Sequence, residues 1–195
     1  MSPDGVSGDP TLDVSVFDGV LRDRTDDPAA AVEAFTHSGG TAAMWCASAV
    51  LVVALALVRR RGDAVLVGGA MFTGLVLMSA LKRLWRRERP PIPERLVDVD
   101  SYSFPSGHAM MTAIFAVTVG FVVVTSVGPR VLEATLAALL VVFTLGIGLS
   151  RVYLAAHWAT DVAAGWLFGV VWGAVWIVAR RSAWRVAWPR RHRPR

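Results

Sequence analysis

The sequence predicts an all-α integral membrane protein: a helical bundle of about five transmembrane helices preceded by an amphipathic region at the membrane surface. Hydrophobic residues make up 54% of its 195 residues. The charged residues gather in clusters and leave apolar stretches of about 18 residues or more, which is enough to cross a hydrocarbon core of ~30 Å. In lipid such stretches are helices, because a helix satisfies its own backbone hydrogen bonds.

The first predicted unit, residues 1–40, lies on the membrane and does not cross it. Asp13 is expected to cap a short amphipathic helix, and a second short helix is expected to run as far as Phe35. Gly39 and Gly40 then mark a break. Acidic residues make insertion of this segment costly, so we expect it to lie at the interface.

The second unit is a transmembrane domain over residues 41–180, and a basic tail over residues 181–195 follows it. A hydrophilic loop with four prolines, residues 82–105, separates the second span from the third. The five predicted spans are Thr41 to Val58, Ala64 to Leu81, Ala109 to Val127, Val131 to Leu149, and Val162 to Ala179.

Glycines recur every fourth residue along the fifth span, at Gly165, Gly169 and Gly173. Such a series lets another helix approach closely, either in a homo-oligomer or within the monomer. The same spacing runs back through Asp161 to His157, so the stripe also carries polar residues. Packing within the monomer is therefore favoured, with this stripe facing the bundle interior.

Alternating crossings place every chemically suggestive residue on one membrane face. The end of span two, the start of span three, the end of span four and the start of span five all meet there. On that face Lys82, Arg89 and Arg151 are cations that suit a phosphate group. Arg83, Arg86 and Arg87 are interpreted as ordinary interfacial arginines, whose stems cover apolar surface.

Two histidines on this face suggest phosphoryl chemistry. Ser106 and Gly107 open span three, where free backbone N–H groups bind phosphate and a hydroxyl can donate, and His108 could protonate a leaving oxygen. His157 and Asp161, four residues apart, are expected to stack on one helical face. A carboxylate beside an imidazole fixes its tautomer and makes it a better nucleophile.

These residues resemble the three motifs of the type-2 phosphatidic acid phosphatase superfamily. The chain matches all eleven identities in order and at the family spacing, over a layout of about Thr41 to Ala179. The matching residues are Lys82, Arg89, Pro90, Pro105, Ser106, Gly107, His108, Ser150, Arg151, His157 and Asp161. Many members have six spans; this chain is expected to have five and a pair of surface helices.

The resemblance implies a lipid phosphatase that works through a phosphohistidine. His157 would attack phosphorus, Asp161 would support it, and His108 would protonate the leaving group. The phosphoryl oxygens would be held by Lys82, Arg89, Ser106, Gly107 and Arg151. The family mechanism needs no metal or cofactor, which agrees with the lack of a carboxylate cluster in the sequence.

The substrate implied first is undecaprenyl pyrophosphate, followed by phosphatidic acid, phosphatidylglycerophosphate and a prenyl-linked sugar phosphate. A non-catalytic lipid-phosphate transporter or scaffold is the main alternative, although binding alone needs neither a nucleophile nor an acid. A phosphotransferase with an acceptor other than water also fits. A soluble vanadate-dependent peroxidase shares the motifs, but the spans count against it.

The charge distribution predicts how the chain sits in a bacterial-type cell membrane. The net charge is +5. Eleven basic residues, including the seven arginines from Arg180 to Arg195, lie on the face opposite the motifs with only two acids. Arginines beside a span set topology, so the tail is expected in the cytoplasm and the active site outside it. Nucleic-acid binding is not expected, because no base-reading fold accompanies the basic tail.

Overall fold

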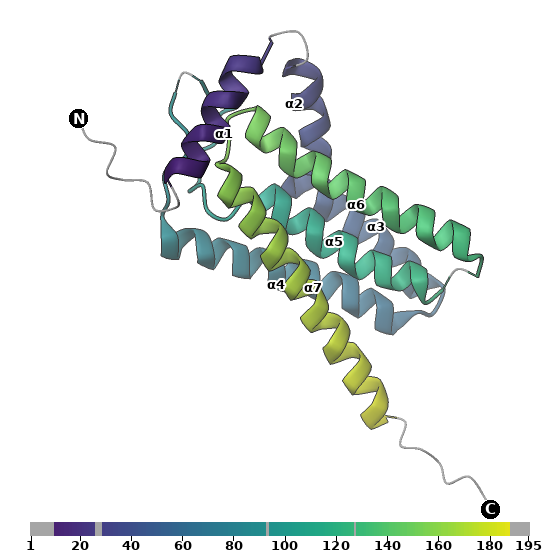
Figure 1. Cartoon of the computed structure of the whole chain (residues 1–195). Helices are drawn as coiled ribbons and strands as arrows, with labels where there is room; N and C mark the ends of the chain where they lie inside the picture. The colour runs from purple at the N-terminus through teal and green to yellow at the C-terminus, as the bar shows by residue number, and fades with distance from the viewer. Residues whose placement is uncertain (1–9, 26–28, 93, 127, 188–195) are drawn as a thin grey trace, which may run out of the picture.

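The computed structural model describes residues 10–25, 29–92, 94–126 and 128–187, and these residues form seven α-helices without a β-strand. The helices are α1 (Pro10–Asp23), α2 (Ala29–Ser38), α3 (Thr41–Leu57), α4 (Arg61–Trp85), α5 (Gly107–Val124), α6 (Arg130–Tyr153) and α7 (Ala159–Ala187). Figure 1 shows α3 to α7 as a bundle, with α1 and α2 gathered at one end of it.

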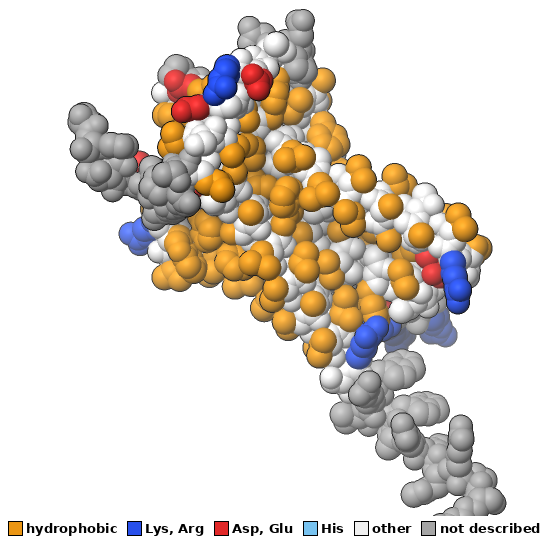
Figure 2. Space-filling model, viewed as in Figure 1, with side chains coloured by type: hydrophobic (Ala, Val, Ile, Leu, Met, Phe, Trp, Pro, Cys, Tyr) orange, Lys and Arg blue, Asp and Glu red, His pale blue; other side chains and the backbone are white. Residues whose placement is uncertain are grey.

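Within the described residues, five segments are long and apolar enough to cross a membrane, which confirms the predicted all-α membrane fold. They are Ala29–Leu57, Arg61–Trp85, Gly107–Val124, Arg130–Tyr153 and Ala159–Ser182. Hydrophobic side chains cover the middle of the bundle in Figure 2, as expected for a surface that faces lipid. Lys and Arg side chains gather near the end from which the C-terminal helix emerges.

Helix α5 is the centre of the bundle and packs against α3, α4, α6 and α7. Met71 of α4 and Met110, Met111 and Ile114 of α5 are fully buried where these two helices meet. The glycine stripe of α7 lies on α5: a Cβ at Gly169 would come within 2.5 Å of the Met110 carbonyl oxygen. Packing of this stripe within the monomer is therefore confirmed.

The N-terminal segment is helical, as expected, with the predicted break at Gly39 and Gly40. The role predicted for Asp13 is wrong: α1 begins at Pro10, and the Asp13 carboxylate is buried against α7 rather than capping its own helix. Since only two glycines separate α2 from α3, the first candidate span includes both helices. The predicted surface location of this segment stays a prediction.

The C-terminal helix is longer than the predicted fifth span, because α7 continues to Ala187. The boundary expected at residue 181 therefore falls inside a helix. Residues 188–195 of the basic tail lie outside the described residues, so their cytoplasmic location also stays a prediction.

Candidate active site

A cavity of about 560 Å³ lies at the end of the bundle where α4 and α6 end and α5 begins. Four distant chain segments meet there, as the alternating crossings predicted. Six of the eight predicted site residues line it. They are Lys82, Arg89, Gly107, His108, Arg151 and His157.

The His157 ring is held with its two nitrogens in different surroundings. Nε2 lies on the cavity side, 3.1 Å from Arg89 Nη1. A guanidinium can only donate, so Nε2 accepts this hydrogen bond and Nδ1 carries the ring proton. Nδ1 lies 3.5 Å from Asp161 Oδ2 and 3.4 Å from Ser103 Oγ, on the buried side. This tautomer leaves the Nε2 lone pair on the side that a ligand reaches.

His157 reaches Asp161 in a different way from the one predicted. Helix α7 begins at Ala159, so His157 lies in the preceding turn and the two residues do not stack on one helical face. Asp161 instead occupies the third position of the helix, where its Oδ2 accepts the Trp158 backbone N–H at 3.0 Å. This is the arrangement by which an acidic side chain caps its own helix. The predicted pairing holds, with a turn supplying the histidine.

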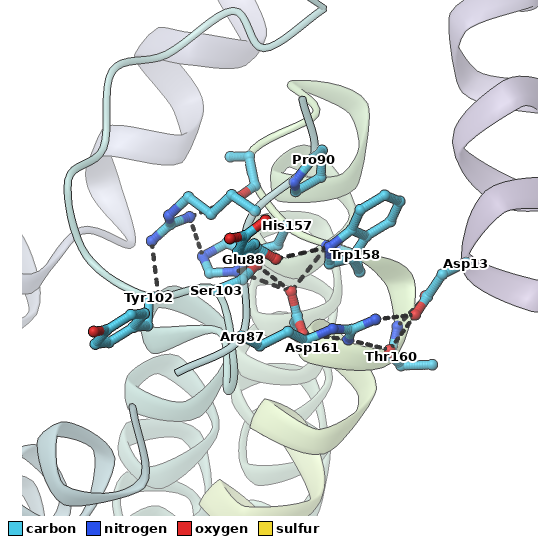
Figure 3. A network of polar contacts seen from close by, with 12 residues as sticks. Asp13, Arg87, Glu88, Pro90, Tyr102, Ser103, His157, Trp158, Thr160 and Asp161 are labelled. Atoms are coloured by element: carbon cyan, nitrogen blue, oxygen red, sulfur yellow. Dashed lines mark hydrogen bonds and ion pairs between the residues drawn. The ribbon is translucent and has the colours of Figure 1, made fainter. Parts of the chain in front are cut away.

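Arg87 is the residue that sequence reasoning most clearly misjudged. It is only 3% exposed, and its Nη1 donates to Asp161 Oδ1 at 2.6 Å while its Nη2 donates to Asp13 Oδ2 at 2.6 Å. Figure 3 shows this guanidinium between the two carboxylates. The interpretation of Arg87 as an interfacial arginine is therefore wrong. Burying an unpaired guanidinium would cost too much free energy, and here the two carboxylates compensate its charge.

Ser103 is a second residue that the motifs do not contain. It is fully buried in the loop before α5, and its hydroxyl donates a hydrogen bond to Asp161 Oδ2. Its backbone N–H donates to the Arg87 carbonyl at 2.8 Å, which ties this loop to the end of α4. With Arg87, Ser103 and Trp158, the Asp161 carboxylate has three hydrogen-bond donors besides the imidazole.

Basic side chains dominate the cavity wall. Lys82, Arg83, Arg89 and Arg151 line it, against one acid, Asp100. Arg89 donates to the carbonyls of Ser101 and Ala156, both at 2.6 Å, and so joins the proline-rich loop to the turn that carries His157. The Lys82 ammonium donates to the Tyr102 carbonyl. Arg151 is 3% exposed, and its Nε has no hydrogen-bond partner among the described residues.

Only part of the Pro-Ser-Gly-His segment lines the cavity. Gly107 is the first residue of α5 and lines the cavity with His108. Ser106 precedes the helix, and its backbone N–H donates to the Asp161 carbonyl at 3.0 Å. The Ser106 side chain, however, is fully buried, does not line the cavity and has no hydrogen-bond partner among the described residues. Its role as a phosphate ligand stays a prediction.

Helix α2 and the break that follows it pack beside residues of the cavity, which the sequence did not indicate. Thr36 of α2 is fully buried, and its hydroxyl lies 2.9 Å from Ser150 Oγ and 3.4 Å from Arg151 Nη1. A Cβ at Gly40 would lie 3.5 Å from His108 Nε2. The break between α2 and α3 therefore passes directly over one of the two histidines.

Burial and the surrounding cations keep the His157 imidazole neutral. Burial chiefly, with the charges of Arg89 and Lys82, lowers the pKa of His157 to about 3, although its contact with Asp161 acts in the opposite direction. Burial and the neighbouring Arg151 and Arg95 lower the pKa of Arg89 to about 10, which leaves it charged at pH 7. The site thus combines a neutral imidazole with permanent positive charge, as a nucleophile that attacks a phosphate requires.

The sequence profile of the PAP2 superfamily matches residues 63–185, which include every residue of the three motifs. The chain belongs to the PAP2 superfamily. It is 33% identical over 171 residues to decaprenylphosphoryl-5-phosphoribose phosphatase from Mycobacterium tuberculosis, an alignment that covers 85% of this chain and 89% of that protein. It is also 28% identical over 137 residues to phosphatidylglycerophosphatase B from Bacillus subtilis, which covers 70% and 67% of the two chains.

The fold agrees with that of a PAP2 enzyme of known structure. The crystal structure of a transmembrane PAP2-type phosphatidylglycerolphosphate phosphatase from Bacillus subtilis superimposes with a TM-score of 0.81. The match covers 88% of this chain and 86% of that one at 23% identity, so it bears on the fold alone. As a PAP2 member with five candidate spans, the chain is a multi-pass membrane phosphatase that acts on a lipid phosphate.

Proposed function

We propose that this PAP2 phosphatase hydrolyses a polyprenyl-linked phosphate through a phosphohistidine at His157. The observation that carries the reaction is the orientation of the ring: Nε2 lies beside a basic cavity, while Nδ1 is buried against Asp161 and Ser103. A protein that only bound lipid phosphate would gain nothing from a nucleophile held in one tautomer.

The reaction proceeds in two displacements. His157 Nε2 attacks phosphorus and forms an N–P bond as the P–O bond to the lipid breaks, and His108 gives its proton to the departing oxygen. Water then attacks the phosphohistidine, His108 takes a proton from that water, and the N–P bond breaks to release inorganic phosphate. The Asp161 carboxylate accepts a hydrogen bond from His157 Nδ1–H. It therefore stabilises the positive charge on the imidazole ring of the phosphohistidine intermediate.

The basic side chains of the cavity would stabilise the negative charge that develops on the phosphoryl oxygens. Lys82, Arg89 and Arg151 surround the space from three different segments, and the first N–H groups of α5 begin at Gly107. Such preorganised donors are usually the largest single contribution to phosphoryl transfer. Ser106 would join this set only if its buried hydroxyl turned toward the cavity.

A polyprenyl-linked phosphoribose is the substrate that we favour. The relative that matches 85% of this chain is a phosphatase for decaprenylphosphoryl-5-phosphoribose. A volume of about 560 Å³ has room for a headgroup larger than one phosphate. Undecaprenyl pyrophosphate is the substrate that the sequence analysis favoured. Its terminal phosphate would lie among the same basic side chains, so it is the main alternative substrate.

Phosphate release by the purified protein in detergent tests this proposal. The panel contains decaprenylphosphoryl-5-phosphoribose, undecaprenyl pyrophosphate and phosphatidic acid, each with wild type, His157→Ala and His37→Ala. The exposed His37 controls for the loss of an imidazole. We expect release by wild type and His37→Ala, fastest from the phosphoribose lipid, and none by His157→Ala. Activity in His157→Ala would refute the assignment of His157 as the nucleophile. A faster rate with undecaprenyl pyrophosphate would refute the preference for the phosphoribose lipid.

We also propose that the cavity opens on the extracytoplasmic face and that the C-terminus is cytoplasmic. The support is the count of eleven basic residues against two acids on the opposite face. The Lys and Arg side chains near the emerging C-terminal helix in Figure 2 agree with that count.

A further inference from the structure

Asp13, Arg87 and Asp161 form a row of three buried charges behind the cavity. Asp13 is 1% exposed, Arg87 is 3% exposed and Asp161 is 0% exposed. The residues come from α1, from the chain just after α4, and from α7, and Figure 3 shows the guanidinium in the middle of the row. Only Asp161 belongs to a PAP2 motif, so the other two charges need an explanation of their own.

The Asp13 carboxylate is fully committed to the start of α7 and to Arg87. Its Oδ1 accepts the Thr160 backbone N–H at 2.9 Å, one of the N–H groups that the first turn of a helix leaves free. Its Oδ2 accepts hydrogen bonds from Thr160 Oγ1 and from Arg87 Nη2, both at 2.6 Å. The Phe17 ring packs on Trp158 with centroids 5.5 Å apart, which holds α1 in this place.

Arg87 in turn fixes the Asp161 carboxylate. Its Nη1 donates to Asp161 Oδ1 and to Thr160 Oγ1, at 2.6 and 2.7 Å. Oδ1 is thereby held on the side away from the imidazole, which leaves Oδ2 as the oxygen that faces His157 Nδ1. The guanidinium also lies over the Trp158 ring, 5.7 Å from its centroid. Its orientation is therefore set by contacts on both sides.

The charges along this row explain why a second carboxylate is needed. Arg87 alone would neutralise Asp161 and weaken the support that a negative carboxylate gives to a positive imidazole. With Asp13 the row carries one net negative charge, and the buried guanidinium has two partners rather than one. Asp13 thus allows Arg87 to orient Asp161 without cancelling its effect on His157.

We propose that Asp13 and Arg87 are positioning residues for phosphoryl transfer: Asp13 holds Arg87 against Asp161, which keeps His157 Nε2 directed into the cavity. This inference rests on the proposed function, because it takes His157 as the nucleophile. It assigns the N-terminal helix a part in the chemistry. The competing explanation is that the same contacts only attach α1 to the bundle.

The test separates these explanations by measuring rate and amplitude in one experiment. Full-length protein is mixed with an excess of the lipid of the panel that wild type hydrolyses fastest, radiolabelled in its terminal phosphate, and its first turnover is quenched at short times. The amplitude of labelled protein counts folded sites, and the rate constant reports attack by His157. Asp13→Asn removes the charge and keeps an oxygen for the Thr160 N–H, so α1 stays attached.

We expect Asp13→Asn to slow labelling about 10-fold and Arg87→Gln about 100-fold, the range in which misplaced or unsupported catalytic groups fall. KM should change less than about twofold, because neither side chain lines the main cavity. The double variant should be no slower than Arg87→Gln, because Asp13 acts through Arg87. Asp18→Asn, exposed on α1, and Arg86→Gln, exposed beside Arg87, should match wild type.

Each remaining outcome has a separate meaning. A wild-type rate with reduced amplitude in Asp13→Asn would show a structural attachment only and would overturn the inference, even if Arg87→Gln fails to fold. Equal slowing by Asp18→Asn would overturn it as well. Wild type that releases phosphate without becoming labelled would overturn the proposed phosphohistidine itself, which is a failure of the function and not of the positioning.

Discussion

Replacing Gly169 with alanine tests the helix contact on which the site depends. The added Cβ would lie 2.5 Å from the Met110 carbonyl oxygen and 2.6 Å from Ala113 Cβ. Both are parts of α5 that no side-chain rotation can move, so α7 must shift away. Overpacking of this kind costs about 1–3 kcal/mol. For a chain of this size that corresponds to a Tm lower by about 2–12 °C.

The assay is thermal unfolding in detergent, with phosphate release measured on the same samples. Gly120→Ala is the matched control, because a Cβ there meets nothing within 4 Å, and the better helix former should keep or raise stability by up to ~1 kcal/mol. Activity should fall in Gly169→Ala, since α5 carries His108 and α7 carries Asp161. A Gly169→Ala variant as stable and active as Gly120→Ala would refute the proposed role of this contact.

Three further predictions concern charge, topology and metal ions. Arg89→Gln should raise the pKa of His157 above its value of about 3, because it removes a positive charge beside the ring; a histidine NMR titration that showed no rise, or a fall, would contradict this. In wild type the same titration should show His157 uncharged from pH 8 down to about pH 4, since a lowered pKa delays protonation. A protease added outside intact cells should leave a C-terminal tag uncut, and cleavage would reverse the proposed orientation. EDTA should leave phosphate release unchanged, because the proposed reaction uses His157, His108 and the basic side chains of the cavity; a loss restored by added metal would argue against a metal-free reaction.

The membrane bundle and the core of the site could be predicted because both follow from regular periodicities. Long apolar segments fixed the spans, and their alternation placed the motifs on one face. The glycine series identified the side of α7 that meets α5, since the residues repeat at the helical spacing. Where the chain is regular, position in the sequence determines position in space.

The support behind the site could not be predicted because it depends on irregular segments. Helix α4 ends at Trp85, and Arg86 adopts a left-handed conformation with φ of 47°. That turn points the next residue, Arg87, into the protein, whereas a continued helix would have given no reason to bury it. Its partner Asp13 lies 74 positions away in the sequence. Choosing that pair among 20 basic and 15 acidic residues needs the fold itself.

The hydrogen bond between Arg89 and His157 bears on how the proposed reaction begins. A lone pair that accepts a hydrogen bond is not free to attack, and Arg89 Nη1 occupies the Nε2 lone pair at 3.1 Å. The same guanidinium is among the groups that would hold a phosphoryl oxygen. In the proposed reaction an arriving phosphate would therefore compete for this donor, and its negative charge would draw the guanidinium away from the imidazole. Neutral electrophiles in the bilayer lack that charge, so on the proposed mechanism they would meet a Nε2 lone pair already engaged by Arg89.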